Sequence, residues 1–140
     1  MVSRYYHLLD PNLEGMKYTI DKQEQFTLIN LHEEKLDSTL APQLKSDFVT
    51  LNTEGTRNVI LDLKEVKYID SSGLSALLVG NRITNEGGGI LVLTAISDHV
   101  FKLIKISQLD SILNILPTVE EARDAVFMHE IEGDMNEDEN

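Results

Sequence analysis

Short apolar runs and longer segments with helical periodicity alternate along most of this chain. Five runs rich in apolar residues predict strands, at residues 17–20, 26–31, 59–63, 90–93 and 112–115. Only the polar residues 21–25 separate the first two runs, so we expect these strands to pair as a hairpin. The later runs alternate with helical segments, which indicates mainly parallel strands joined by right-handed crossovers. The predicted class is α/β, with a mixed, mostly parallel sheet and four helices.

The first helix is predicted after residue 38 by four apolar residues at near-helical spacing, namely Leu40, Leu44, Phe48 and Leu51. Either Ser38 or Thr39 can cap it, and Pro42 falls in its first turn, where a missing N–H costs little. Gly55 is a plausible end for this helix.

Three further helices are predicted after residue 70. The first of them spans residues 74–85, and its wide apolar arc predicts deep burial, with Gly80 allowing a close approach to the sheet. Ser97 can cap the next helix, whose inward residues are expected to be Val100, Phe101 and Ile104. A Thr-x-x-Glu capping box at Thr118 starts the last helix, and its core stripe comprises Val119, Ala122 and Val126.

The two ends of the chain differ in composition from the domain between them, residues 16–128. Residues 1–15 form a polar and aromatic N-terminal extension, which is either dispensable or an ordered turn or strand that covers a sheet edge with Tyr5, Tyr6 and Leu8. Residues 129–140 are strongly acidic and have too little hydrophobicity for their charge, so we expect a disordered tail.

Composition narrows the possible functions. The 140 residues include 12 basic and 24 acidic residues, giving a net charge of −12. Such a charge argues against a general nucleic-acid binder, which needs Lys and Arg against the phosphate backbone. No apolar stretch approaches the ~20 residues of a membrane span, and the N-terminus lacks the apolar core of a signal peptide. A cytoplasmic protein is the expectation.

No motif in the chain predicts catalysis, a cofactor or a metal. The four histidines, His7, His32, His99 and His129, share no ligand spacing. The glycines at 87–89 precede a strand instead of following one, unlike a phosphate-binding loop. A phospho-aspartate receiver would need a lysine near its last strand, and a Gly-x-Ser-x-Gly nucleophile elbow is absent. With no cysteine, thiolate chemistry is also excluded. We do not expect an enzyme.

Two adjacent hydroxyls, Ser71 and Ser72, lie where an apolar strand is followed by a helix. In an open α/β sheet, loops at such positions commonly form sites. A hydroxyl at a helix start can cap free backbone N–H groups. It can also be a phosphorylation target whose added charge changes the surface. From the residues alone, both roles remain open.

The stretch Asp70-Ser71-Ser72-Gly73-Leu74 resembles the STAS domain family, in particular the single-domain anti-sigma factor antagonists of bacteria. The similarity extends over about residues 16–128. It includes Leu36-Asp37, the strand at 59–63, the glycine turn into the strand at 90–93, and residues 101–109.

The resemblance implies a STAS fold, with four or five strands and helices packed against them. It further implies that Ser72 is phosphorylated by a serine kinase that is also an anti-sigma factor. The unphosphorylated protein would bind this anti-sigma factor and release a sigma factor, and a phosphatase of the PP2C type would reset the cycle. The residues implied in partner binding are Asp37, Asp70, Ser71, Ser72, Gly73 and Leu74.

A phosphate on Ser72 would deepen an acidic patch, because Asp70 is adjacent and Asp37 is expected on the same rim. Alternatively, Ser72 only caps the helix and Asp37 only starts the preceding one. Ser71 is expected to form a local hydrogen bond, and Ser75 is an alternative phosphorylation target.

One departure affects the choice of partner. Residues 32–37 lack the glycine that the family commonly has near the turn before Asp37. A STAS adaptor of another complex, in lipid transport or a signalling scaffold, is therefore the alternative function, with Ser72 unmodified. The oligomeric state stays open.

Overall fold

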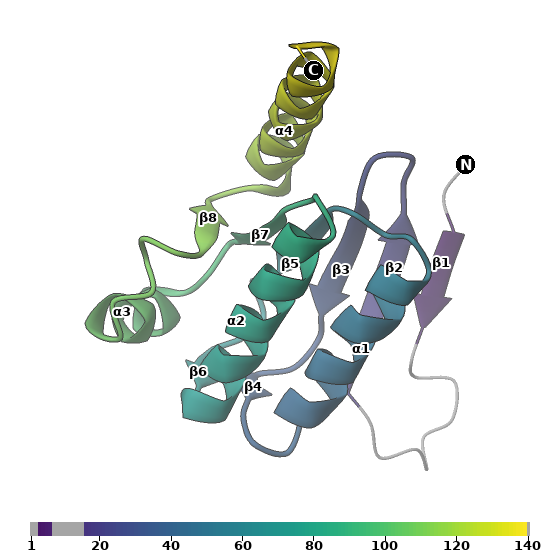
Figure 1. Cartoon of the computed structure of the whole chain (residues 1–140). Helices are drawn as coiled ribbons and strands as arrows, with labels where there is room; N and C mark the ends of the chain where they lie inside the picture. The colour runs from purple at the N-terminus through teal and green to yellow at the C-terminus, as the bar shows by residue number, and fades with distance from the viewer. Residues whose placement is uncertain (1–2, 7–15, 140) are drawn as a thin grey trace.

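The main sheet has six strands in the order β1-β2-β3-β5-β7-β8 (Figure 1). The computed structural model describes residues 3–6 and 16–139. The strands are β1 (Ser3–Tyr6), β2 (Tyr18–Lys22), β3 (Thr27–Leu31), β5 (Val59–Asp62), β7 (Leu91–Thr94) and β8 (Asn114–Leu116). Pairing is antiparallel from β1 to β3 and parallel from β3 to β8. The predicted hairpin and the predicted mixed, mostly parallel sheet are therefore confirmed.

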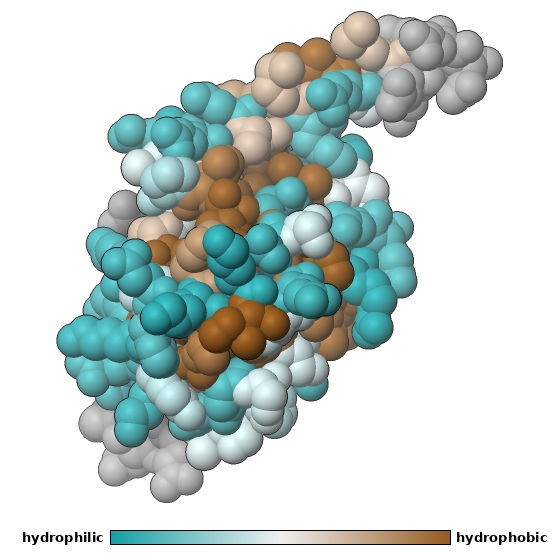
Figure 2. All heavy atoms as spheres, turned by 90° about the vertical axis from the view of Figure 1, so that its left-hand side faces the viewer, coloured by the Kyte–Doolittle hydropathy of each residue, from teal (hydrophilic) through white to brown (hydrophobic). Residues whose placement is uncertain are grey.

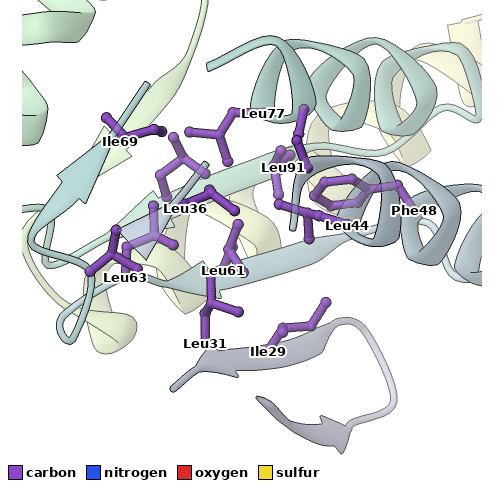
Figure 3. Packing of buried hydrophobic residues seen from close by; sticks show 14 of the residues in the cluster. Ile29, Leu31, Leu36, Leu44, Phe48, Leu61, Leu63, Ile69, Leu77 and Leu91 are labelled. Atoms are coloured by element: carbon purple, nitrogen blue, oxygen red, sulfur yellow. The ribbon is translucent and has the colours of Figure 1, made fainter. Parts of the chain in front are cut away.

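Four helices cover the two faces of this sheet. They are α1 (Ala41–Thr53), α2 (Ser71–Glu86), α3 (Asp98–Ile106) and α4 (Val119–Glu139). The buried strands β5 and β7 alternate their side chains between two cores. Leu61 joins the larger core with residues of α1 and α2 (Figure 3). Leu93 and the buried residues of α3 belong to the same core, whereas Ile60 and Val92 pack with α4. Helix α4 thus lies on the face opposite to α1 and α2.

Helix α1 begins differently from the prediction. Leu40 is its N-cap residue and makes no side-chain capping bond, so the prediction that Ser38 or Thr39 caps the helix is wrong. The reason is that Asp37 organises the preceding turn: its carbonyl oxygen accepts the N–H groups of Leu40 and Ala41. Thr39 instead donates to the Asp37 carboxylate. The helix ends at Thr53, and Gly55 follows it with a φ of 92°.

Helices α3 and α4 start as predicted. The Ser97 hydroxyl accepts the N–H of Val100, and the Thr118 hydroxyl accepts the N–H of Glu121. Phe101, however, is exposed, so the prediction that it points inward is wrong. Helix α3 has only nine residues. Val100 and Ile104 are its buried residues, and the partly buried Leu103 packs beside them.

A second, two-stranded parallel sheet was not predicted. It pairs β4 (Lys35–Leu36) with β6 (Tyr68–Ile69). Each strand has two residues, too few for any alternation of apolar and polar positions to be recognised. This small sheet carries the chain from β3 to α1 and from β5 to α2.

The N-terminal end of the chain agrees with one of its expected forms, whereas the C-terminal end differs from its expected form. Strand β1 lies at the sheet edge, which supports an ordered strand in the N-terminal extension; Leu8 lies outside the described residues. Residues 129–139 are helical and continue α4, whereas the sequence suggested a disordered tail. No proline follows Thr118 to interrupt the helix. Within the described ranges, no helix is long and apolar enough to cross a membrane.

Gly80 of α2 approaches helix α1, not the sheet as the sequence suggested. A Cβ atom at Gly80 would lie 2.4 Å from Cε2 of Phe48, and Phe48 is 1% exposed. Gly80→Ala is therefore expected to lower the free energy of unfolding by about 1 kcal/mol or more, because overpacking outweighs the gain in helix propensity. Urea denaturation measures the change.

Gly133→Ala in α4 is the matched control, because nothing lies within 4 Å of the added Cβ. This variant should gain up to about 1 kcal/mol from helix propensity. Equal effects of the two substitutions would contradict the packing of α1 against α2.

Candidate functional site

The small sheet brings two loops together at the start of α2. Lys35 pairs with Tyr68 and Leu36 with Ile69. The carbonyl oxygen of Glu34 accepts the N–H groups of residues 67 and 68, at 2.8 and 3.0 Å. As a result, residues 37–40 and 70–73, which are distant in sequence, lie side by side at one end of the molecule.

The carboxylate of Asp70 caps α2 and also holds the neighbouring loop. Its backbone is extended, as an N-cap requires. Oδ1 accepts the N–H of Gly73 at 2.9 Å, and Oδ2 accepts the N–H of Ser38 at 3.2 Å. The capping role considered for Ser72 is therefore wrong, because Asp70 fills it. The hydrogen bond to Ser38 also joins Asp70 to the loop that carries Asp37. The two carboxylates therefore lie at the same end of the molecule.

Gly73 and Leu74 lie beneath this surface. A Cβ atom at Gly73 would lie 2.2 Å from the carbonyl oxygen of Leu36 and 2.6 Å from Cγ1 of Ile69. Glycine is thus the residue that lets the two loops approach. Leu74 is buried in the larger core. The structure gives both residues a packing role, and their contact with a partner stays a prediction.

Ser71 and Ser72 are the first two residues of α2. Ser71 is exposed and Ser72 is half-buried. Neither side chain makes a hydrogen bond within the part of the chain that the structure describes, so the local bond expected for Ser71 is not formed. Both hydroxyls lie at the positive end of the helix dipole. Ser75 lies one turn further along and is also half-buried.

Asp37 is the second carboxylate at this end of the molecule. It accepts hydrogen bonds from the hydroxyl and the backbone N–H of Thr39. These bonds, the hydroxyl bond first, hold the pKa of Asp37 below its ordinary value. Asp37 is therefore ionised at neutral pH. Its role at the start of α1 is observed, and its contact with a partner stays a prediction.

An exposed aromatic pair borders the site, and the sequence pattern did not reveal it. Tyr68 is exposed and stacks on His99 of α3, with the ring centroids 6.3 Å apart. On the face that carries α3, apolar side chains lie exposed among hydrophilic ones (Figure 2). In the sequence, only the presence of Tyr68 directly before the buried Ile69 pointed to this aromatic surface.

The structure supplies no set of metal ligands among the described residues. His32 contacts Glu65 and lies 3.3 Å from the Thr19 hydroxyl. His129 lies 3.0 Å from the carbonyl oxygen of Gly88. His99 stacks on Tyr68, and His7 lies outside the described residues.

Comparison with known proteins agrees with this arrangement. The family model described as STAS domain matches residues 17–122. BtrV of Bordetella bronchiseptica, named as an anti-sigma factor antagonist, is 33% identical over 107 residues, which cover 76% of this chain and 91% of BtrV. The anti-sigma-B factor antagonist of Staphylococcus aureus is 26% identical over 93 residues, which cover 66% of this chain and 85% of that protein.

Solved structures share the fold. The structure of the Bacillus cell fate determinant SpoIIAA in its phosphorylated form has a TM-score of 0.61 against this chain, at 23% identity. The match covers 78% of this chain and 98% of SpoIIAA.

The capping geometry predicts which polar residue stabilises α2. Asp70→Ala should lower the free energy of unfolding by about 1 kcal/mol, within a range of roughly 0.5–2, because it removes the cap. Ser72→Ala should change it by less than about 0.5 kcal/mol. Urea denaturation of both variants provides the comparison. A larger loss for Ser72→Ala than for Asp70→Ala would show that the capping assignment is incorrect.

The hydrogen bonds of the turn at Asp37 predict how the pKa of its carboxyl group changes on mutation. Thr39→Val should raise the pKa of Asp37 toward its ordinary value of 3.8, because it removes the hydroxyl hydrogen bond. Since the pKa of the folded state is lowered, this interaction stabilises the fold above pH 3.8 and is lost as pH falls through the lower value. NMR titration of the side-chain carboxyl carbon measures it. An unchanged pKa in Thr39→Val would mean that the hydroxyl plays no part.

Proposed function

The chain belongs to the STAS domain family, and from this premise we propose that it is an anti-sigma factor antagonist switched by phosphorylation of Ser72. In its unphosphorylated form it binds an anti-sigma factor and thereby releases a sigma factor. The role is regulatory and not catalytic, and it is exercised in the cytoplasm. The names of BtrV and of the Staphylococcus aureus relative support this assignment.

The resemblance to the family places the phosphate acceptor at Ser72, and the structure supports this choice because Ser72 has no capping role. Asp70 supplies the cap of α2, so the Ser72 hydroxyl is not required for the fold. It occupies the second position of the helix, on an element that is fixed by the buried Gly73 and Leu74. A kinase can therefore modify Ser72 without removing an interaction that holds the domain together.

The charge of the surroundings explains how a phosphate would act. A phosphoserine adds about −1.5 to −2 charges at pH 7. The N-terminus of α2 favours this anion locally, so the helix need not unfold. The new charge is added beside Asp70, close to the loop of Asp37, on a chain whose net charge is already −12. A partner surface that docks beside these two carboxylates would be repelled once the phosphate is added.

The proposed contact surface comprises the exposed rim of this site. Asp37, Asp70, Ser71 and Ser72 provide its polar part, and Gly73 and Leu74 support it from below. Tyr68 adds exposed aromatic surface beside the carboxylates, and aromatic residues are enriched in the cores of interfaces.

The partner that fits this cycle is an anti-sigma factor with serine kinase activity. A single protein would then bind the unmodified site and phosphorylate it, which ends its own binding. A phosphatase of the PP2C type would remove the phosphate and restore the first state. Such a cycle requires only a local change of charge at a surface that keeps its shape.

The test uses the purified chain with a serine kinase of the anti-sigma type encoded beside its gene. We expect one phosphate, on Ser72, after incubation with ATP, detected by mass spectrometry. Ser72→Asp should weaken binding of this partner by about 100-fold or more, since like charges across an interface cost several kcal/mol. Ser72→Ala should bind the partner but resist phosphorylation.

Ser75→Asp is the matched control, because it places the same charge one turn further along α2. It should weaken binding much less than Ser72→Asp. If no phosphate is found and Ser72→Asp binds the partner as the wild type does, the switch is refuted and an adaptor role replaces it.

A further inference from the structure

Helix α4 carries an exposed apolar stripe, which comprises Phe127, Met128, Ile131 and Met135. These side chains are 39% to 59% exposed. At 3.6 residues per turn they share an arc of roughly 100°. Ala122 and Val126, which are fully buried, lie on the other side of the helix. Helix α4 therefore has two apolar sides, and the core of the domain covers only one of them.

A groove runs between this stripe and the turn that joins β2 to β3. Phe26, Phe127 and Ile131 supply apolar lining, and Glu24 and Asp134 supply carboxylates. The guanidinium of Arg123 lies over the Phe26 ring, 6.0 Å from its centroid. Within the described part of the chain, neither Glu24 nor Asp134 forms an ion pair. The groove thus combines an apolar floor with a net negative charge, because the carboxylates in its lining outnumber Arg123.

The helix is fixed in place beside this groove. Glu130 Oε1 accepts a hydrogen bond of 2.7 Å from the buried side chain of Asn58, and Oε2 lies 3.6 Å from Nη1 of Arg57. Beyond this anchor, α4 extends past the end of the sheet (Figure 1). The stripe is therefore presented on a rigid element, so that a ligand would not have to order it.

The negative charge around the groove indicates which kind of ligand can bind there. Residues 130–140, EIEGDMNEDEN, contain six acidic residues and no basic residue. A second copy of the chain would bring two such segments together, and a membrane surface rich in anionic lipids would be repelled as well. We infer that the α4 groove binds a basic amphipathic helix of a partner protein, with the apolar face of that helix on the stripe and its Lys and Arg residues toward the carboxylates.

The groove is remote from the phosphorylation site. It lies at the beginning of β3, on the face of the sheet that α4 covers, and its Glu130 bonds to Asn58 just before β5. Ser72 lies at the opposite end of the strands, at the start of α2 on the other face. Both surfaces can therefore be occupied together, and this second surface does not depend on the function proposed for the first.

The test measures binding of a fluorescent helical peptide with one leucine face and one lysine face, by anisotropy with the full chain. We expect saturable binding that Phe127→Ser combined with Ile131→Ser weakens by about tenfold or more, because two large apolar contacts are lost. Met135→Ser alone should weaken it less. All three side chains are exposed, so the variants should fold, which circular dichroism checks.

Two controls separate this surface from general charge attraction. Val49→Ser, at an apolar residue of α1 that is 53% exposed, and Ser72→Asp should both bind the peptide as the wild type does. A peptide with glutamate in place of lysine should not bind. Equal binding by wild type and the double variant, or no binding of the lysine peptide, would overturn the inference. So would sedimentation of the wild type as a dimer that the double variant abolishes.

Discussion

The carboxylate of Asp70 is the interaction on which the geometry of the site depends. One oxygen caps α2 through Gly73 and the other holds the backbone of Ser38. The same side chain therefore fixes the start of the helix and the position of the neighbouring loop. Because Asp70 performs the capping, the hydroxyl of Ser72 has no structural duty. The residue proposed for phosphorylation thus lies on a surface that other residues hold in place.

The rest of the fold keeps this arrangement rigid. The pairing of β4 with β6 sets the distance between the loops, and the absence of a side chain at Gly73 lets the backbone of Leu36 pass closely. Below them, Leu36, Ile69 and Leu77 join the core shared by α1, α2 and the sheet (Figure 3). A charge added at the surface is therefore expected to change what binds there and to leave the domain folded.

Much of the fold could be predicted from sequence because the buried strands and helices have clear periodicities. That Asp37 and residues 70–74 lie on one rim could be predicted, but the hydrogen bonds that hold them there could not. Ser38, Thr39 and Ser72 are all good capping residues by type. Sequence alone cannot show that the carbonyl oxygen of Asp37 and the carboxylate of Asp70 accept the available N–H groups instead. The two-residue strands that join the loops have no readable pattern. The charge of residues 129–139 suggested disorder, whereas the structure continues α4 through them.

The most direct measurement compares amide NMR spectra of the unmodified chain with those of a chain carrying phosphoserine at position 72. A local switch on a rigid surface predicts shift changes confined to residues 37–40 and 70–75, with α1 and the strands of the main sheet unchanged. Changes spread through α1, α2 and the sheet would contradict it, because they would mean that the phosphate acts by rearranging or loosening the domain.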